Sequence, residues 1–155
     1  MSIDKITIHH MAACWSVERC GESFAQVSRQ ASANYAIDSD GNVGLFVDEG
    51  DRAWTTSSPS NDNRAITIEV ANDVYGENWH VSDTAFNKLI DLCVDICQRN
   101  GIESINYTGG QSGNLTLHKW FAPTACPGEY LEGRMQEIAD LINERLGVRI
   151  EPTVS

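Results

Sequence analysis

The run from Ala65 to Ala71 alternates between apolar and polar side chains, and this alternation constrains the fold more than any other feature of the chain. Its isoleucine and valine residues are separated by Thr67 and Glu69. Because successive side chains of a β-strand point to opposite faces of a sheet, the pattern predicts a strand. A strand this rich in β-branched residues is typical of the centre of a sheet, so we expect a central strand here.

The rest of the chain contains further predicted strands and several predicted helices. Strand-like stretches lie at residues 4–9, 35–38, 42–47 and 105–107, and residues 39–41 form a turn between the second and third of them. Helical periodicity predicts helices at 17–30, between Ser82 and Gly101, and from about Gly128 to Gly147. Ser82 is a typical helix N-cap, and Gly101 is a typical helix end. Residues 50–63 are polar and predict a loop.

Strands and helices intermixed in one chain of 155 residues predict an α/β fold with a single domain. We expect a central mixed β-sheet flanked by α-helices on both faces. The domain is predicted to span residues 1–147, and residues 148–155 are predicted to be a C-terminal tail or the start of a linker.

The charge balance excludes several classes of partner. The chain has 22 acidic and 11 basic residues, which gives a formal net charge of −11. This surplus argues against binding to nucleic acid and against attraction to an anionic membrane surface. No apolar run is long enough to cross a bilayer, and residues 1–5 lack the pattern of a signal peptide. We therefore expect synthesis in a cytoplasm.

The five cysteines are an odd number, which fits poorly with a closed set of disulfides. Cys93 and Cys97 fall on the apolar stripe of a predicted helix, where thiols pack as small hydrophobic groups. Cys14 and Cys20 are near each other in sequence and could form a pair. Cys126 has a different setting, because it lies between two prolines in a turn-rich segment.

That segment, Leu117–Gly128, places His118 eight residues before Cys126. Imidazole and thiolate groups both suit zinc. The first predicted strand ends in His9-His10, of which only one can face a given site because adjacent strand residues point in opposite directions. Two histidines and one cysteine can hold a catalytic zinc and leave its fourth position for water. The alternative is that the histidine pair is structural. The spacing matches no zinc finger.

Four segments together resemble a known family, the type 2 N-acetylmuramoyl-L-alanine amidases, which include peptidoglycan recognition proteins and many phage endolysins. The resemblance covers residues 3–146. The segments are Ile6–His10, Asn34–Asp38 with the following Asp40-Gly41, Ala65–Val70, and His118–Gly128 with its Pro-Thr-Ala-Cys-Pro-Gly ending. One departure from the family pattern is Thr55-Thr56 after Trp54, where many relatives carry a histidine that contacts substrate.

The resemblance implies a set of site residues in a surface cleft. Zinc would be held by His9, the first of the histidine pair, with His118 and Cys126. Glu69 occupies the position of the catalytic base that moves the proton of the attacking water. Tyr35 could donate a hydrogen bond to the developing oxyanion, or simply pack in its strand.

Thr124 lies two residues before the cysteine of this segment. Its hydroxyl could bond the reacting water, or Thr124 could be a plain turn residue.

The implied activity is zinc-dependent hydrolysis of the amide between N-acetylmuramic acid and L-alanine in bacterial peptidoglycan. The alternatives are a non-catalytic peptidoglycan-binding module of the same fold and a glycan-cleaving lysozyme built on paired carboxylates. The setting implied is a phage endolysin or autolysin, made without a signal peptide and acting on the wall after release, or a cytoplasmic wall-recycling amidase. A wall-binding domain on a longer parent chain is a further expected partner.

Overall fold

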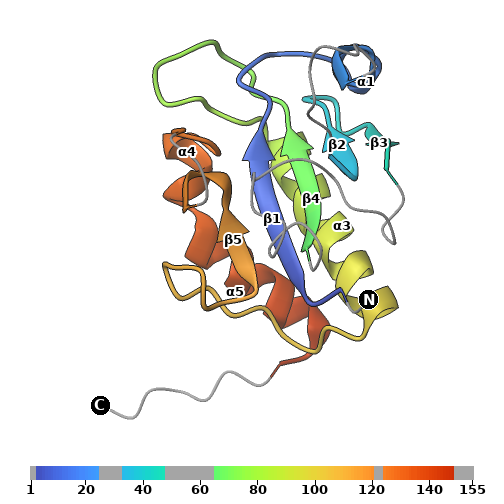
Figure 1. Cartoon of the computed structure of the whole chain (residues 1–155), viewed down its shortest axis with the longest axis vertical. Helices are drawn as coiled ribbons and strands as arrows, with labels where there is room; N and C mark the ends of the chain where they lie inside the picture. The colour runs from blue at the N-terminus through green and yellow to red at the C-terminus, as the bar shows by residue number, and fades with distance from the viewer. Residues whose placement is uncertain (1–2, 25–32, 48–64, 121–123, 149–155) are drawn as a thin grey trace.

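The structure is a computed structural model of the chain and describes residues 3–24, 33–47, 65–120 and 124–148. Within these ranges one sheet of five strands has the order β3-β2-β4-β1-β5 (Figure 1). The strands are β1 (Lys5–His10), β2 (Tyr35–Ile37), β3 (Val43–Leu45), β4 (Ala65–Val70) and β5 (Leu115–Leu117). Neighbours are parallel from β5 across to β2, and the edge strand β3 is antiparallel to β2. The sheet is therefore mixed, and the alternating strand β4 lies at its centre, as predicted.

The helices in the described ranges are α1 (Val17–Phe24), α3 (Asp83–Asn100), α4 (Glu129–Glu132) and α5 (Met135–Leu146), with a short 3-10 turn, η1 (His118–Trp120). The predicted limits of α3 are confirmed. The Ser82 side chain accepts a hydrogen bond from the backbone N–H of Ala85, and Gly101 ends the helix with a φ of 71°. Only glycine adopts this left-handed conformation at little cost.

The two faces of the sheet have different chemistry. One face carries isoleucines that pack against α3 and α5, which lie behind the sheet in Figure 1, and these residues form the main core. The isoleucines are Ile6 and Ile8 of β1 and Ile66 and Ile68 of β4. On the opposite face, Val17 and Cys20 of α1 pack against Ala36 of β2. Helices thus cover both faces, but the second face keeps polar side chains on its central strands.

The predicted strand at residues 105–107 is wrong. These residues form no strand, and the sheet edge beside β1 is instead β5, which the sequence analysis missed. The backbone N–H of Ile105 donates to Asn143 Oδ1 at 2.7 Å, and Asn143 Nδ2 donates to the Ile105 carbonyl at 2.8 Å. A side-chain amide on α5 therefore provides the hydrogen bonds that a neighbouring strand would otherwise supply.

The predicted C-terminal helix is two helices, α4 and α5, that are separated at Gly133 and Arg134. Its end is confirmed, because Gly147 adopts a φ of 78° directly after α5. Several predictions fall outside the described residues: the end of the helix at 17–30, the loop at 50–63, the Thr55-Thr56 departure, and most of the tail after residue 147.

All five cysteines are free thiols. Cys93 and Cys97 are buried in the main core, as predicted. Cys14 is exposed whereas Cys20 is buried, so these two do not pair. The helices in the described ranges include none that is long and apolar enough to span a bilayer.

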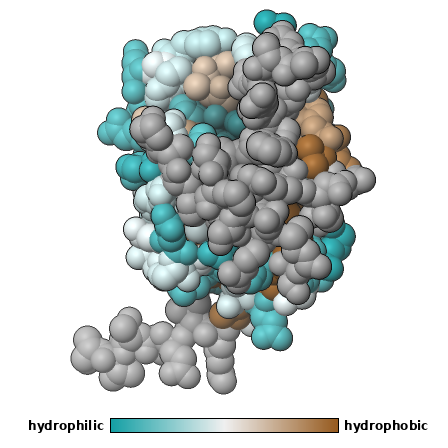
Figure 2. All heavy atoms as spheres, in the orientation of Figure 1, coloured by the Kyte–Doolittle hydropathy of each residue, from teal (hydrophilic) through white to brown (hydrophobic). Residues whose placement is uncertain are grey.

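The exposed apolar side chains of the edge strand β3 stand out on the surface. Val43 and Leu45 are 41% and 54% exposed. Figure 2 shows brown, hydrophobic surface on the right of the molecule, where β3 lies in Figure 1.

Candidate active site

Three of the predicted site residues meet at one edge of the sheet because their strands are parallel. His9 of β1 is in register with Glu69 of β4, and His118 follows directly after β5, whose Leu117 pairs with Ile8. The carboxyl ends of parallel strands lie at the same edge, at the top of Figure 1, and ligands of open α/β sheets bind there. His9 and Glu69 also share the polar face of the sheet, opposite the isoleucine core.

Cys126 comes to the same edge on a loop that several backbone contacts hold in place. The backbone N–H of His10 points at Cys126 Sγ at 3.4 Å. The backbone N–H of Lys119 donates to the Cys126 carbonyl at 3.1 Å. The backbone N–H of Cys126 in turn donates to Thr124 Oγ1 at 3.2 Å. The thiol is therefore fixed between the ends of β1 and β5.

The resulting cluster consists of His9, His118 and Cys126, whose ligand atoms all lie within 4.8 Å of one another. His9 Nδ1 is 3.6 Å from Cys126 Sγ, and the two imidazole rings have centroids 4.5 Å apart. His9 Nε2 is buried and has no hydrogen-bond partner in the described chain. An orphaned imidazole nitrogen beside a second histidine and a thiol fits a zinc ion, which prefers nitrogen and sulfur ligands in this number.

The electrostatics of the cluster agree with a metal centre. Burial, with the neighbouring histidines, lowers the pKa of His9 well below its usual value, so the imidazole is neutral, as a metal ligand must be. Burial, with the nearby Glu69 carboxylate, raises the pKa of the Cys126 thiol. A buried thiol of this kind loses its proton when a metal cation binds to the sulfur.

Glu69 stands beside the cluster without being one of its three members. Its Oε1 is 3.9 Å from His9 Nδ1, and 13% of its side-chain area is exposed. Burying most of a carboxylate away from water costs free energy unless a cation is paired with it. A catalytic role would explain why a carboxylate is kept at this position. The position is therefore suited to accept a proton from a water bound next to the histidines.

The structure does not bring Tyr35 to this cluster, which corrects the expectation that it could bond an oxyanion. Its ring packs against the main core, and its hydroxyl accepts a hydrogen bond from Arg99 Nη2 of α3 at 3.4 Å. Tyr35 alternates with Ala36, which is in register with Glu69, so Tyr35 lies on the other face of the sheet. The packing alternative is the one that the geometry supports.

Thr124 is exposed in the loop before Cys126. Its hydroxyl accepts the backbone N–H of Cys126, so its observed contact holds the turn.

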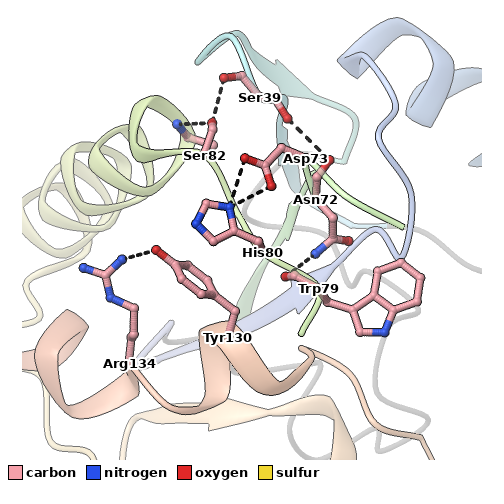
Figure 3. A network of polar contacts seen from close by, with 9 residues as sticks. Ser39, Asn72, Asp73, Trp79, His80, Ser82, Tyr130 and Arg134 are labelled. Carbon is pink, nitrogen blue, oxygen red and sulfur yellow. Dashed lines mark hydrogen bonds and ion pairs between the residues drawn. The ribbon is translucent and has the colours of Figure 1, made fainter. Parts of the chain in front are cut away.

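The loop between β4 and α3, residues 71–81, braces the site, and the sequence analysis did not find this. The Trp79 ring meets the His10 ring edge-on with centroids 5.2 Å apart. Asn72 Nδ2 donates to the Trp79 carbonyl at 2.8 Å (Figure 3). Gly128 must be glycine here, since its φ is 88° and an added Cβ would lie 3.0 Å from Trp79 Cβ and 3.1 Å from His10 Nδ1. The sequence signal was Gly128 after Cys-Pro, which the sequence analysis used as a helix start and as the end of the segment that resembles the family.

A polar network ties the same loop to the two C-terminal helices (Figure 3). His80 Nδ1 is 2.7 Å from Asp73 Oδ1. The His80 ring stacks at a tilt on Tyr130, whose hydroxyl accepts a hydrogen bond from Arg134. The Arg134 guanidinium also lies 3.7 Å from the ring centroid of Phe86 on α3. The network links the loop at residues 71–81 to α3, to α4 and, through Arg134, to the start of α5.

Comparisons with known proteins are consistent with this geometry. A family model described as N-acetylmuramoyl-L-alanine amidase matches residues 1–129. Among solved structures, PlyL matches with a TM-score of 0.72 and 17% identity, covering 92% of this chain and 84% of that one. The Staphylococcus aureus hydrolase AmiA, solved with its ligand, matches with a TM-score of 0.72 and 19% identity over 95% of this chain and 76% of that chain.

A third structure was solved with a substrate. The N-acetylmuramyl-L-alanine amidase AmiD from E. coli, in complex with anhydro-N-acetylmuramic acid-L-Ala-D-gamma-Glu-L-Lys, matches with a TM-score of 0.65 and 20% identity. The match covers 90% of this chain and 57% of that one. These similarities show that the fold is shared. No curated protein sequence matches the chain.

Proposed function

Because the chain belongs to the N-acetylmuramoyl-L-alanine amidase family, we propose that it hydrolyses the amide between N-acetylmuramic acid and L-alanine in bacterial peptidoglycan. The observation that carries the proposal is the convergence of His9, His118 and Cys126 with a largely buried Glu69 at the carboxyl edge of the sheet. The AmiD structure supports the substrate class, since its bound molecule contains this linkage.

The proposed cofactor is one zinc ion held by His9, His118 and Cys126. Zinc in such a site supplies a Lewis acid that polarises a carbonyl and lowers the pKa of water. The chain provides two imidazoles and one thiol for it, and His10 points its backbone N–H at Cys126 Sγ. This contact stabilises negative charge on the sulfur.

Glu69 is proposed to move the proton in the reaction. Its carboxylate accepts the proton of the attacking water and returns it to the nitrogen of the leaving L-alanine, so the amine departs uncharged. The 3.9 Å separation between Glu69 Oε1 and His9 Nδ1 leaves the carboxylate close to the cluster yet distinct from it. Thr124 contributes by holding the turn before Cys126.

The biological setting follows as a further part of the proposal. The substrate is the cell wall, and the chain acts there after release from the cytoplasm in which it is made, as an endolysin or autolysin does. Its net charge of −11 provides no attraction to an anionic wall, so tight wall binding would require a separate wall-binding domain.

Digestion of purified peptidoglycan, with metal analysis of the same sample, tests the function. We expect about one zinc per chain. Mass spectrometry should detect new L-alanine amino termini without new reducing sugars, and chelation should abolish their release. New reducing sugars would instead identify a glycosidase, and metal-free protein that binds the wall without cutting it would identify a binding module.

A further inference from the structure

Trp79 has a backbone conformation that a residue with a side chain rarely adopts. Its φ is 55°, in the left-handed region, and the φ of the nearby Glu77 is 53°. This conformation costs free energy for any residue other than glycine, and it persists only where the surrounding contacts impose it. Because strain of this kind concentrates at functional sites, Trp79 is a candidate for a functional role.

Several hydrogen bonds hold the loop around Trp79 in this conformation. The Trp79 N–H donates to the Gly76 carbonyl at 2.9 Å, and the buried Asn72 donates from Nδ2 to the Trp79 carbonyl at 2.8 Å (Figure 3). The N–H of Asp73 donates to the His80 carbonyl at 2.9 Å and closes the base of the loop. Since both backbone polar groups of Trp79 are bonded, the direction in which its side chain leaves the loop is fixed.

The Trp79 side chain contacts both segments that hold the sulfur of Cys126. Its ring meets the His10 ring at 85°, with centroids 5.2 Å apart. Its Cβ lies against Gly128, where an added Cβ would be only 3.0 Å away. The Gly128 N–H donates to the Ala125 carbonyl at 2.9 Å, which closes the turn that contains Cys126. One side chain therefore packs against the end of β1 and against the turn that carries the thiol.

His10 connects Trp79 to the sulfur. The His10 backbone N–H points at Cys126 Sγ at 3.4 Å, so the position of His10 determines a contact that stabilises negative charge on the sulfur. His10 Nδ1 is buried beside Gly128 and has no hydrogen-bond partner in the described part of the chain. This side of the ring is therefore held by packing rather than by a hydrogen bond.

We propose that Trp79 is a positioning residue for the metal site: its ring holds His10 in place, and His10 in turn holds the Cys126 sulfur where a zinc ligand is needed. The inference rests on the metal site of the proposed function and does not depend on which bond is cleaved. On this view, the strained backbone of Trp79 is what directs an aromatic ring at His10.

The zinc affinity of Trp79→Ala tests the proposal. Alanine keeps the Cβ beside Gly128 and removes the ring from His10. We expect the Kd for zinc, measured by competition with a chromophoric chelator, to rise by about tenfold or more, as is typical when a group that orients a metal ligand is lost. Trp79→Phe restores an aromatic ring and should recover most of the affinity. Tyr75→Ala removes a 64% exposed ring from the same loop and should leave the Kd unchanged.

Cobalt substitution provides a second measurement, which a merely structural role of Trp79 would not change. Co²⁺ bound to a thiolate gives a near-ultraviolet charge-transfer band that depends on the metal–sulfur geometry. In folded protein saturated with Co²⁺, this band should be shifted or weakened in Trp79→Ala but not in Tyr75→Ala. An unchanged Kd for zinc, or an unchanged band, would overturn the proposal. Should Trp79→Ala fail to fold, Trp79→Leu is measured by the same two criteria.

A double-mutant cycle tests whether Trp79 acts through His10. If it does, the variant that combines Trp79→Ala with His10→Ala should have a Kd for zinc no higher than that of His10→Ala alone. Increases that multiply in the double variant would show that the two residues act independently, and this would contradict the proposed role.

The same measurements distinguish failure of this inference from failure of the amidase proposal. If the unchanged chain binds no zinc, the metal site is wrong and this inference fails with it. If the chain binds zinc but releases no L-alanine amino termini from peptidoglycan, the amidase proposal is wrong. The Kd values and the cobalt band then still decide the role of Trp79.

Discussion

Glu69 is the residue whose chemistry and position are hardest to explain without catalysis. It interrupts the apolar pattern of β4 and lies 3.9 Å from His9 Nδ1, with most of its side chain buried. A mere packing role would favour an uncharged residue of similar size at this position. Replacing Glu69 therefore tests the proton transfer while leaving the three clustered residues unchanged.

Glu69→Gln should lower kcat by about 10²- to 10⁴-fold, because glutamine cannot accept the proton of the attacking water. Zinc content should remain near that of the unchanged chain, since Glu69 is not one of the three clustered ligands. Steady-state kinetics on a muramyl peptide, with metal analysis of both proteins, provides the check. Near-normal turnover in the variant would remove Glu69 from the mechanism.

Tyr35 illustrates the opposite case, a residue that the family resemblance favoured and the geometry places elsewhere. Its hydroxyl meets Arg99 on the helix face of the sheet. Tyr35→Phe should change the free energy of unfolding by less than about 1 kcal/mol, since one long, partly exposed hydrogen bond is lost. We expect kcat to stay within about twofold, the effect typical of a residue away from the site. A large fall in kcat with normal stability would restore its catalytic role.

At the scale of elements, the N-terminus of α3 depends on a single hydroxyl. Ser82 Oγ accepts the backbone N–H of Ala85 at 3.1 Å and donates to the Ser39 carbonyl at 2.8 Å, so it also ties α3 to the turn between β2 and β3 (Figure 3). Because α3 forms most of the packing behind the sheet, its start influences the whole core.

Ser82→Ala should destabilise the chain by about 1 kcal/mol, the usual cost of losing an N-cap side chain. Urea unfolding measured side by side with Ser104→Ala, a change at an exposed serine outside the helices, provides the comparison. The control should stay within about 0.5 kcal/mol of the unchanged chain. Equal stability of the two variants would show that the cap contributes nothing.

At the scale of the whole molecule, two buried histidines link folding to pH. Burial lowers the pKa of His10 from 6.5 to about 4 and lowers that of His9 further. Between these values the unfolded chain binds protons that the folded chain does not, so stability must fall as the pH decreases below about 6.5. The contribution of the two neutral histidines to the free energy of unfolding is fully present above that pH.

Urea unfolding of metal-free protein between pH 7 and pH 5 tests this linkage, in a range where exposed carboxylates stay ionised. The free energy of unfolding should decrease steadily as the pH falls. His10→Gln should show a shallower decrease, because one titrating group has been removed. Identical slopes for the two proteins would mean that His10 has the same pKa in the folded and the unfolded chain, against the lowered pKa given above.

Local patterns in the sequence determined most of the elements, and together with a family resemblance they pointed to the residues of the proposed metal site. The alternation around Glu69, the Ser82 cap and the glycine ends of the helices are properties of neighbouring residues, and they need no tertiary contact to be recognised. The choice of His9, His118 and Cys126 came from zinc chemistry together with a family resemblance, and the structure brings all three together.

The tertiary structure alone decided how distant residues meet. Residues 115–117 form the edge strand β5 because they pair with β1. Residues 105–107 form no strand, and the backbone of Ile105 is hydrogen-bonded by the side-chain amide of Asn143 instead. Whether Tyr35 lies on the face of the sheet with Glu69 or on the face with Arg99 depends on the register of β2. A shift of this register by one residue would move Tyr35 to the opposite face. The brace of Trp79 against His10 likewise depends on contacts between segments far apart in the chain. The periodicity of apolar residues in the sequence indicates on which face of its own element a side chain lies, but not which distant residues pack against that face.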